Sequence, residues 1–414
     1  KSSAASDVYK RQVLEDVVKK LALVVQRYGL EVNGGAELLM RQMAEHLNGK
    51  YDVEVLTTKA VDYLTWKDEY EKNNEVINGV LVRRFGVKKP RSIKRFGHLS
   101  MLIDKPFNMH FLEDKWVDSQ GPYCPELIEY IKANKDKYDV FVFMTYLYYT
   151  TVRGIKEVAD KSILIPTAHD EPTIYYDVYK DVFTKPSGIF YCTVTEKNFV
   201  ENKFHNENII NNGGFGGAGI ELPPDIEPYK FKKERGIDNY IVYVGRIDTH
   251  KGCQQLFEYF IKYKQEKNND VKLVLMGKTV MEIPERDDII SLGFVSEELK
   301  YNVMAGADAL IMPSEFESLS IVVLESLALG VPVIVNGLCE VLKQHCVISR
   351  AGTYYTNYDE FANQLDDMVC DGGLREEMGK LGVQYVDRYY RWDKIIDSFS
   401  QMVEKVSDKA ERKE

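Results

Sequence analysis

The feature that most constrains this chain is a repeated alternation of short apolar runs and amphipathic helical stretches. The runs are continuous and rich in β-branched residues, as in strands buried on both faces of a parallel sheet. The stretches between them show helical spacing of apolar residues, which predicts helices that cover those faces. We therefore expect a doubly wound α/β architecture. The predicted strands are residues 21–25, 53–57, 80–85, 140–144, 163–166, 189–193, 208–211, 240–244, 271–276, 289–293, 309–312 and 331–335.

The runs fall into two series, separated by residues 221–236, whose three prolines and mixed charge indicate a linker. A chain of 414 residues is long enough for two or three domains. We expect one domain over residues 13–225 and a second over 226–391. An amphipathic helix at about 392–414 is expected to pack back on the first domain. Residues 1–12 are polar and aperiodic, and we interpret them as a non-native disordered leader.

Charge and cysteine content exclude several classes of protein. The net charge of −10 argues against a general nucleic-acid binder. The six cysteines are scattered, with no C-x-x-C pair and no zinc spacing, as expected of reduced thiols in a cytoplasmic chain. No window approaches the roughly 18 apolar residues of a membrane-spanning helix.

Two cations follow the predicted strand at 240–244. Arg246 and Lys251 stand between Gly245 and Gly252, in a loop at the carboxyl end of a strand, where ligands of open α/β sheets bind. An arginine offers a fork of donors and a lysine a point charge, a pair that suits a diphosphate. The alternative is a basic turn that forms surface ion pairs.

Two glutamates accompany the predicted strand at 309–312 and the helix after it. Glu317 lies at the helix entrance, and Glu325 lies inside the helix in an otherwise apolar stretch. Ser318 and Ser320 suit helix N-caps, and a helix N-terminus favours a bound phosphate. Glu325 is placed to accept hydrogen bonds from two neighbouring hydroxyls, as on a ribose, and Glu317 to hold sugar hydroxyls. The alternatives are a charge at the helix N-terminus and a solvated helix residue.

The first domain carries two weaker signals. Gly34 and Gly35 follow the first strand and open a helix, where backbone can approach a ligand closely, although the segment is not G-x-G-x-x-G. His169 follows the run at 163–166 and could hydrogen-bond a sugar hydroxyl or move a proton. The alternatives are a plain strand-to-helix turn and a structural histidine.

With these motifs in view, the chain resembles a known family. The segment P-S-x-x-E-(x7)-E over residues 313–325 resembles the signature of retaining nucleotide-sugar glycosyltransferases of the GT-B fold, glycosyltransferase family 4. V-G-R-I-D-x-x-K-G over 244–252, the glycine turn at 34–37 and I-P-T-A-H-D-E-P over 165–172 match in order. One departure is Ser318-Leu319-Ser320, where the family often has Gly-Phe-Gly.

The resemblance implies transfer of a sugar from a nucleoside diphosphate sugar to a hydroxyl of a glycan or lipid-linked acceptor, in cell-surface polysaccharide or glycolipid synthesis, without metal or cofactor. It implies catalytic roles for His169, Arg246, Lys251 and Glu317. The donor-binding residues that it implies are Gly34, Gly35, Gly245, Arg246, Lys251, Phe294, Glu317, Ser318, Leu319, Ser320 and Glu325. The alternatives are a nucleotide-sugar epimerase of the same fold and a catalytically silent nucleotide- or glycan-binding module.

One local charge feature remains. From residue 76 to residue 103 there is no acidic residue but there are seven lysines and arginines, concentrated between Arg83 and Arg95. Such a segment could contact an anionic membrane at the cytoplasmic face or bind a phosphorylated acceptor. The alternative is a solvated loop.

Overall fold

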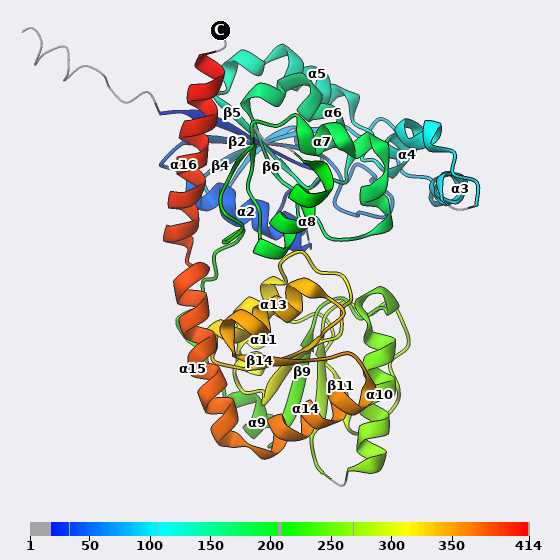
Figure 1. Ribbon diagram of the computed structural model, residues 1–414, viewed down its shortest axis with the longest axis vertical. Coiled ribbons are helices and arrows are strands. Elements are labelled where there is room, and N and C mark those ends of the chain that lie inside the picture. The colour runs from blue at the N-terminus through cyan, green and yellow to red at the C-terminus, as the bar shows by residue number, and fades with distance from the viewer. Residues whose placement is uncertain (1–17, 33, 105, 206–208, 268, 413–414) are drawn as a thin grey trace, which may run out of the picture.

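The computed structural model describes residues 18–412, except residues 33, 105, 206–208 and 268 (Figure 1). The expected leader at 1–12 lies outside the described residues. The first sheet has the strand order β3-β4-β2-β1-β5-β6-β7-β8, and every pair is parallel except the antiparallel pair of β3 and β4. Its strands are β1 (Lys20–Val25), β2 (Asp52–Thr58), β3 (Asn74–Ile77), β4 (Val80–Phe85), β5 (Val140–Met144), β6 (Ser162–Ile165), β7 (Gly188–Ile189) and β8 (Ile210–Asn211).

The second sheet is parallel throughout, with the order β11-β10-β9-β12-β13-β14. In both sheets the strand order reverses near the middle, between β1 and β5 and between β9 and β12, and such switch points are where these folds bind ligands. Its strands are β9 (Tyr240–Val244), β10 (Lys272–Met276), β11 (Ile289–Ser291), β12 (Ala309–Met312), β13 (Val333–Asn336) and β14 (Gly352–Tyr355).

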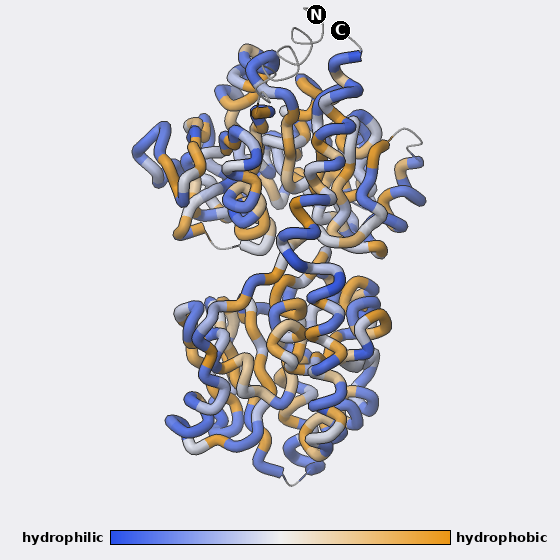
Figure 2. Tube along the Cα trace, turned by 90° about the vertical axis from the view of Figure 1, so that its left-hand side faces the viewer, coloured by the Kyte–Doolittle hydropathy of each residue, from blue (hydrophilic) through white to orange (hydrophobic). Residues whose placement is uncertain are grey.

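Helices cover both faces of each sheet, because successive residues of a buried strand point to opposite faces. In β1, Leu21 and Leu23 join the core beneath one set of helices, and Ala22 and Val24 join the core beneath another. Figure 2 shows the apolar segments gathered inside both lobes. The helices are α2 (Gly35–Leu47), α3 (Ile93–Ile103), α4 (Glu113–Gln120), α5 (Pro125–Ala133), α6 (Tyr149–Val158), α7 (Lys180–Thr184), α8 (Val194–Phe204), α9 (Lys230–Arg235), α10 (Cys253–Glu266), α11 (Glu297–Ala305), α12 (Ile321–Ala328), α13 (Glu340–Ser349), α14 (Tyr358–Cys370), α15 (Gly372–Tyr389) and α16 (Trp392–Glu411).

The last two helices join the two domains. α15 lies along the second domain and α16 along the first (Figure 1). In α16, Phe399 packs edge-on against Phe190 beside the first sheet, with ring centroids 5.1 Å apart. At the turn between α15 and α16, the backbone N–H of Ile220 donates to the carbonyl of Tyr390 at 2.7 Å. The chain therefore crosses between the domains twice at one place.

The structure corrects two sequence expectations about elements. The strand expected at 189–193 ends at Ile189, because Thr193 instead caps α8 by accepting from the N–H of Glu196 at 3.1 Å. The expected linker at 221–236 contains α9, whose Phe231 is buried against the ring of Tyr240. Aromatic burial fixes this part of the segment on the second domain.

Candidate active site

The loop after β9 places Arg246 at the switch point of the second sheet. Its Nε donates to the carboxylate of Asp248, and its Nη1 donates to the hydroxyl of Tyr63 in the first domain at 2.6 Å. Asp248 in turn accepts from the backbone N–H of Lys251 at 2.7 Å. The guanidinium is therefore oriented by one residue of its own loop and by one residue of the opposite domain.

Lys251 and Glu317 come together from different loops. The Lys251 Nζ lies 2.7 Å from Glu317 Oε1, and both side chains are largely shielded from solvent. The close approach depends on Gly252, which has a φ of +75°, and a Cβ there would overlap the carbonyl of Pro313. Gly252 thus holds the loop after β9 against the loop after β12.

Glu325 is 5% exposed and lies in α12 against α11. Its Oε1 accepts from the hydroxyl of Tyr301 at 2.7 Å and from Lys300 Nζ at 3.1 Å. Its Oε2 is buried and has no hydrogen-bond partner among the described residues. Burial raises the pKa of this carboxyl. An unpaired buried carboxylate oxygen is costly, so this atom is suited to accept a hydroxyl from a ligand. Sequence reasoning did not identify Tyr301 or Lys300, because no motif marks them.

The start of α12 differs from the expectation that serines would cap it. Ser320 occupies the N-cap position with a φ of +59°, but its side chain makes no capping hydrogen bond. Ser318 lies ahead of the cap. N-cap residues usually have an extended backbone, and the left-handed backbone of Ser320 departs from that geometry. The first turn of α12 is thus left without a side-chain cap, which is the arrangement that binds anions.

A buried histidine contacts the loop that precedes α12. His345 of α13 lies 2.8 Å through Nε2 from the carbonyl of Leu319 and 2.9 Å through Nδ1 from the hydroxyl of Tyr385. A carbonyl can only accept, so Nε2 carries the proton and Nδ1 accepts from the tyrosine. Burial lowers the pKa of His345 to about 4, which favours this neutral form. The sequence offered no sign of this role.

In the first domain, the glycine turn lies on a buried ion pair. Gly34 is the N-cap of α2, and a Cβ there would overlap the carboxylate of Glu37 and lie 3.2 Å from Arg27 Nη2. Arg27 Nη2 lies 2.5 Å from Glu37 Oε1, and both residues are buried. A Cβ on Gly35 would meet nothing within 4 Å. Gly34 is therefore required by packing, whereas Gly35 borders open space.

His169 faces the second domain. Its ring lies 5.8 Å from the ring of Phe316, next to Glu317 in sequence, and its Nε2 lies 3.6 Å from Glu171 Oε2. Its Nδ1 is buried and has no hydrogen-bond partner among the described residues. The structure therefore brings His169 to the loop that carries Glu317.

The loop of His169 is fixed by a buried glutamate of α8. Glu196, near the start of α8, accepts from the backbone N–H of Ala168 at 2.5 Å and from that of Cys192 at 2.6 Å. Burial raises the pKa of this carboxyl, and the two backbone donors oppose the shift. Glu196 thereby joins the segments that follow β6 and β7.

Two further predictions concern Phe294 and the segment from Arg83 to Arg95. Phe294 is 73% exposed on the loop after β11, whose Gly293 carbonyl accepts from the N–H of Gly277 at 2.8 Å. The interpretation of the segment from Arg83 to Arg95 as a basic surface is partly wrong. Arg84 is buried and paired with Glu75, and Arg83 lies 2.6 Å from Glu54, because both arginines belong to β4.

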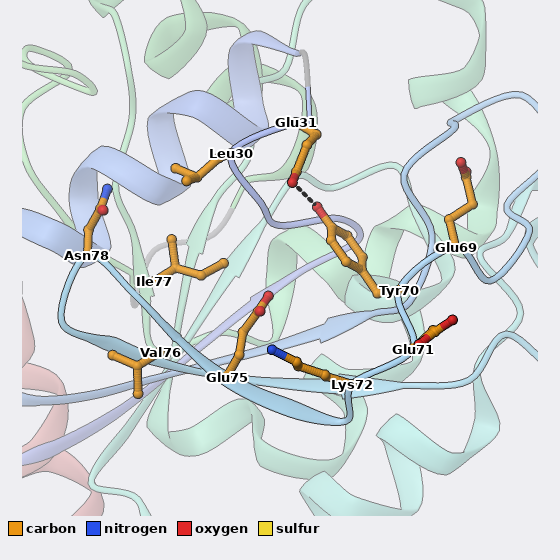
Figure 3. Close-up of a pocket in the computed structure, with 10 residues that line it drawn as sticks. All are labelled: Leu30, Glu31, Glu69, Tyr70, Glu71, Lys72, Glu75, Val76, Ile77 and Asn78. Carbon is orange, nitrogen blue, oxygen red and sulfur yellow. Dashed lines mark hydrogen bonds between the residues drawn. The ribbon is translucent and has the colours of Figure 1, made fainter.

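A pocket of about 500 Å³ opens between the loop after β1 and the edge strand β3 (Figure 3). Tyr70 points toward Glu31 there, and its hydroxyl donates to the carboxylate at 2.7 Å. No predicted site residue lines this pocket.

Among the described residues there is no cluster of three His, Cys, Asp or Glu side chains that could hold a metal ion. No helix in the described part of the chain is both long and apolar enough to cross a membrane.

Comparisons with known proteins agree with this geometry. Residues 225–384 match the family model of Glycosyl transferases group 1. An uncharacterized glycosyltransferase of Methanocaldococcus jannaschii is 29% identical over 184 residues, 41% of this chain and 46% of that protein. The match thus spans about half the length of this curated relative.

Solved structures resemble most of the chain, including both domains. Sucrose-phosphate synthase from Thermosynechococcus elongatus has a TM-score of 0.69 at 16% identity, over 94% of this chain and 99% of that one. Anabaena HepE in complex with UDP and glucose has a TM-score of 0.67 at 14% identity, over 94% of this chain and 100% of that one. The fold is the GT-B fold, as the sequence predicted.

Proposed function

Because residues 225–384 match the family model of Glycosyl transferases group 1 and the chain has the GT-B fold, we propose that this protein transfers a sugar from a nucleoside diphosphate sugar to a hydroxyl acceptor, with retention of configuration. The observation that carries the proposal is the contact of Lys251 with Glu317, just ahead of the uncapped start of α12, together with Asp248, which bonds both Arg246 and the backbone of Lys251. Two cations and a helix N-terminus favour a diphosphate at this point.

Each part of the nucleoside diphosphate sugar has a protein partner in this arrangement. Arg246 and Lys251 bind the diphosphate and stabilise the charge that develops on it as the sugar departs. Glu317, released from Lys251, accepts from sugar hydroxyls. The free Oε2 of Glu325 accepts from the ribose. Phe294 borders the base, and Gly35 allows the backbone of the first domain to approach the phosphates.

The reaction proceeds on one face of the sugar. The acceptor oxygen forms a bond to the anomeric carbon while the bond from that carbon to the phosphate oxygen breaks. The acceptor's hydroxyl proton passes to the leaving phosphate oxygen. The protein's cations neutralise the leaving group, so no metal is needed. His169 holds a hydroxyl of the donor or acceptor through its free ring nitrogen.

Donor turnover tests the proposal. Purified protein is incubated with UDP-glucose and with the GDP and ADP sugars, and release of the nucleoside diphosphate is measured; UDP-glucose comes first because HepE was solved with UDP and glucose. Arg246→Ala and Lys251→Ala should abolish release, whereas Lys262→Ala, an exposed lysine of α10, should not change it. Full activity of the Arg246→Ala, Lys251→Ala double variant would refute these roles.

The acceptor-side domain also carries a surface suited to a membrane that holds a lipid-linked acceptor. α3 and α4 project from the first domain (Figure 1), and the α3 region exposes Ile93, Met101 and Phe107 beside Lys94 and Arg95. Apolar and basic side chains together bind anionic bilayers. We therefore infer peripheral contact at the cytoplasmic face of a membrane, in the synthesis of cell-surface polysaccharide or glycolipid. Sedimentation with phosphatidylglycerol vesicles, but not with phosphatidylcholine vesicles, is expected.

A further inference from the structure

Arg91 is held in the first domain by hydrogen bonds and by two aromatic rings. Its Nε and Nη2 donate to the carbonyl of Gln120 at 2.9 and 2.5 Å, and Nη2 also donates to the Gln120 side chain at 3.1 Å. The guanidinium lies over the rings of Trp66 and Phe96, each 5.1 Å away. The backbone N–H of Arg91 donates to the carbonyl of Thr65 at 2.7 Å. Only Nη1, with two hydrogens, is left without a hydrogen bond from the described residues.

Arg91 also lacks a counter-ion. Of the arginines that the structure describes as buried or half-buried, Arg91 alone has no carboxylate within 4.0 Å; the others are Arg27, Arg41, Arg83, Arg84, Arg153, Arg246 and Arg375. The carboxylate of Asp62, whose charge acts on Arg91, accepts instead from Thr65, at 2.9 Å from the backbone N–H and 2.7 Å from the hydroxyl. Burial lowers the pKa of Arg91, and a bound anion would relieve that cost.

The surroundings place this cation at the switch point of the first sheet. Trp66 packs edge-on against Tyr148, which follows β5, with centroids 5.4 Å apart. The guanidinium of Arg27, which follows β1, lies 5.9 Å from the centroid of the Trp66 ring. Tyr63 then lies 5.6 Å from Arg27 and 5.6 Å from Arg246 of the donor loop. A continuous row of rings and guanidiniums therefore runs from Arg91 to the proposed diphosphate site.

Resting on the proposed function, we propose that Arg91 is the anion subsite for the acceptor, and that its Nη1 binds a phosphate group carried by that acceptor. Because Nε and Nη2 already donate to Gln120, the orientation of Nη1 is fixed in the absence of ligand. Little side-chain entropy is therefore lost when an anion binds.

The test uses the full chain saturated with UDP, so that the diphosphate site is filled. Inorganic phosphate is titrated by calorimetry, first into wild type and then into Arg91→Gln, Arg91→Lys and Arg41→Gln. Arg41 is an arginine of α2 in the same domain, 3.9 Å from Glu45, and serves as the matched control. Phosphate should bind wild type and Arg41→Gln alike. Binding should fall at least tenfold in Arg91→Gln and less in Arg91→Lys, and should weaken with salt.

Two further probes identify the source of the phosphate. Tighter binding of glucose 6-phosphate than of inorganic phosphate supports a phosphorylated glycan, and tighter binding of dihexanoyl phosphatidic acid supports a lipid-linked phosphate. Absence of phosphate binding to UDP-saturated wild type, or equal binding to Arg91→Gln, would overturn the subsite. Failure of UDP itself to bind would instead refute the proposed function, and UDP binding by each variant shows that it is folded.

Discussion

Gly252 offers a sharp test of how the two halves of the donor site are held together. Gly252→Ala introduces two separate costs. The left-handed φ of +75° disfavours any residue with a Cβ, by roughly 1–2 kcal/mol. The new Cβ also overlaps the carbonyl of Pro313, lying 2.9 Å from its carbon, and forcing such an overlap costs roughly 1–3 kcal/mol more. The expected loss of stability is about 2–5 kcal/mol.

Gly236→Ala separates these two costs. Gly236 also lies in the second domain, with a φ of +63°, but a Cβ there meets nothing within 4 Å. It should lose only the backbone cost, about 1–2 kcal/mol. Urea unfolding measures both variants against wild type, and calorimetry measures their affinity for UDP. Because only Gly252→Ala pushes Lys251 away from Glu317, only this variant should bind UDP about tenfold more weakly, roughly 1.4 kcal/mol. Equal destabilisation of the two variants, with equal affinity for UDP, would refute the reasoning.

Two further predictions address buried groups of the second domain. Glu325→Gln should weaken UDP binding by roughly 1.5–3 kcal/mol, the scale of a charged hydrogen bond, whereas Tyr301→Phe should weaken it less. Calorimetry measures both affinities. An unchanged affinity in Glu325→Gln would exclude the ribose contact. The pKa of His345 is about 4 in the folded protein against 6.5 unfolded, so the unfolded state binds a proton first and stability falls as pH drops below 6.5. From pH 7 to pH 5 the loss of stability is about 2 kcal/mol in wild type and should be absent in His345→Gln. Urea unfolding at the two pH values measures it. An equal loss in wild type and in His345→Gln would contradict the assignment to His345.

The sequence predicted the strands of both sheets well where they are long and buried on both faces. Residues 140–144, 240–244 and 309–312 were predicted to the residue. The edge strands β3 and β14 were missed, because half-exposed edges carry mixed residues that give no apolar run. The end of β7 was misplaced because apolar residues continue past the last sheet hydrogen bond to the cap of α8.

Some residues of the site lie in sequence motifs and could be predicted, whereas others carry no motif. Lys251 and Glu317 lie in ordered motifs, and the structure places them 2.7 Å apart. Tyr63 carries no motif, and its contact with Arg246 spans 183 positions of sequence, so only the packing of the domains brings the two together. The same holds for His345, whose helical segment reads as ordinary core. Partners supplied from a distant element leave no local pattern.

The position of α16 has a consequence for how this protein is made. The first sheet is synthesised early. Its residues Phe190 and Gly188, however, contact side chains of α16, which is synthesised last: Phe399 and Met402. Domains generally fold in the order of synthesis, but this one cannot bury the region around β7 until α16 has been synthesised. A nascent chain that lacks residues 392–411 should therefore expose the apolar surface around Phe190 to chaperones.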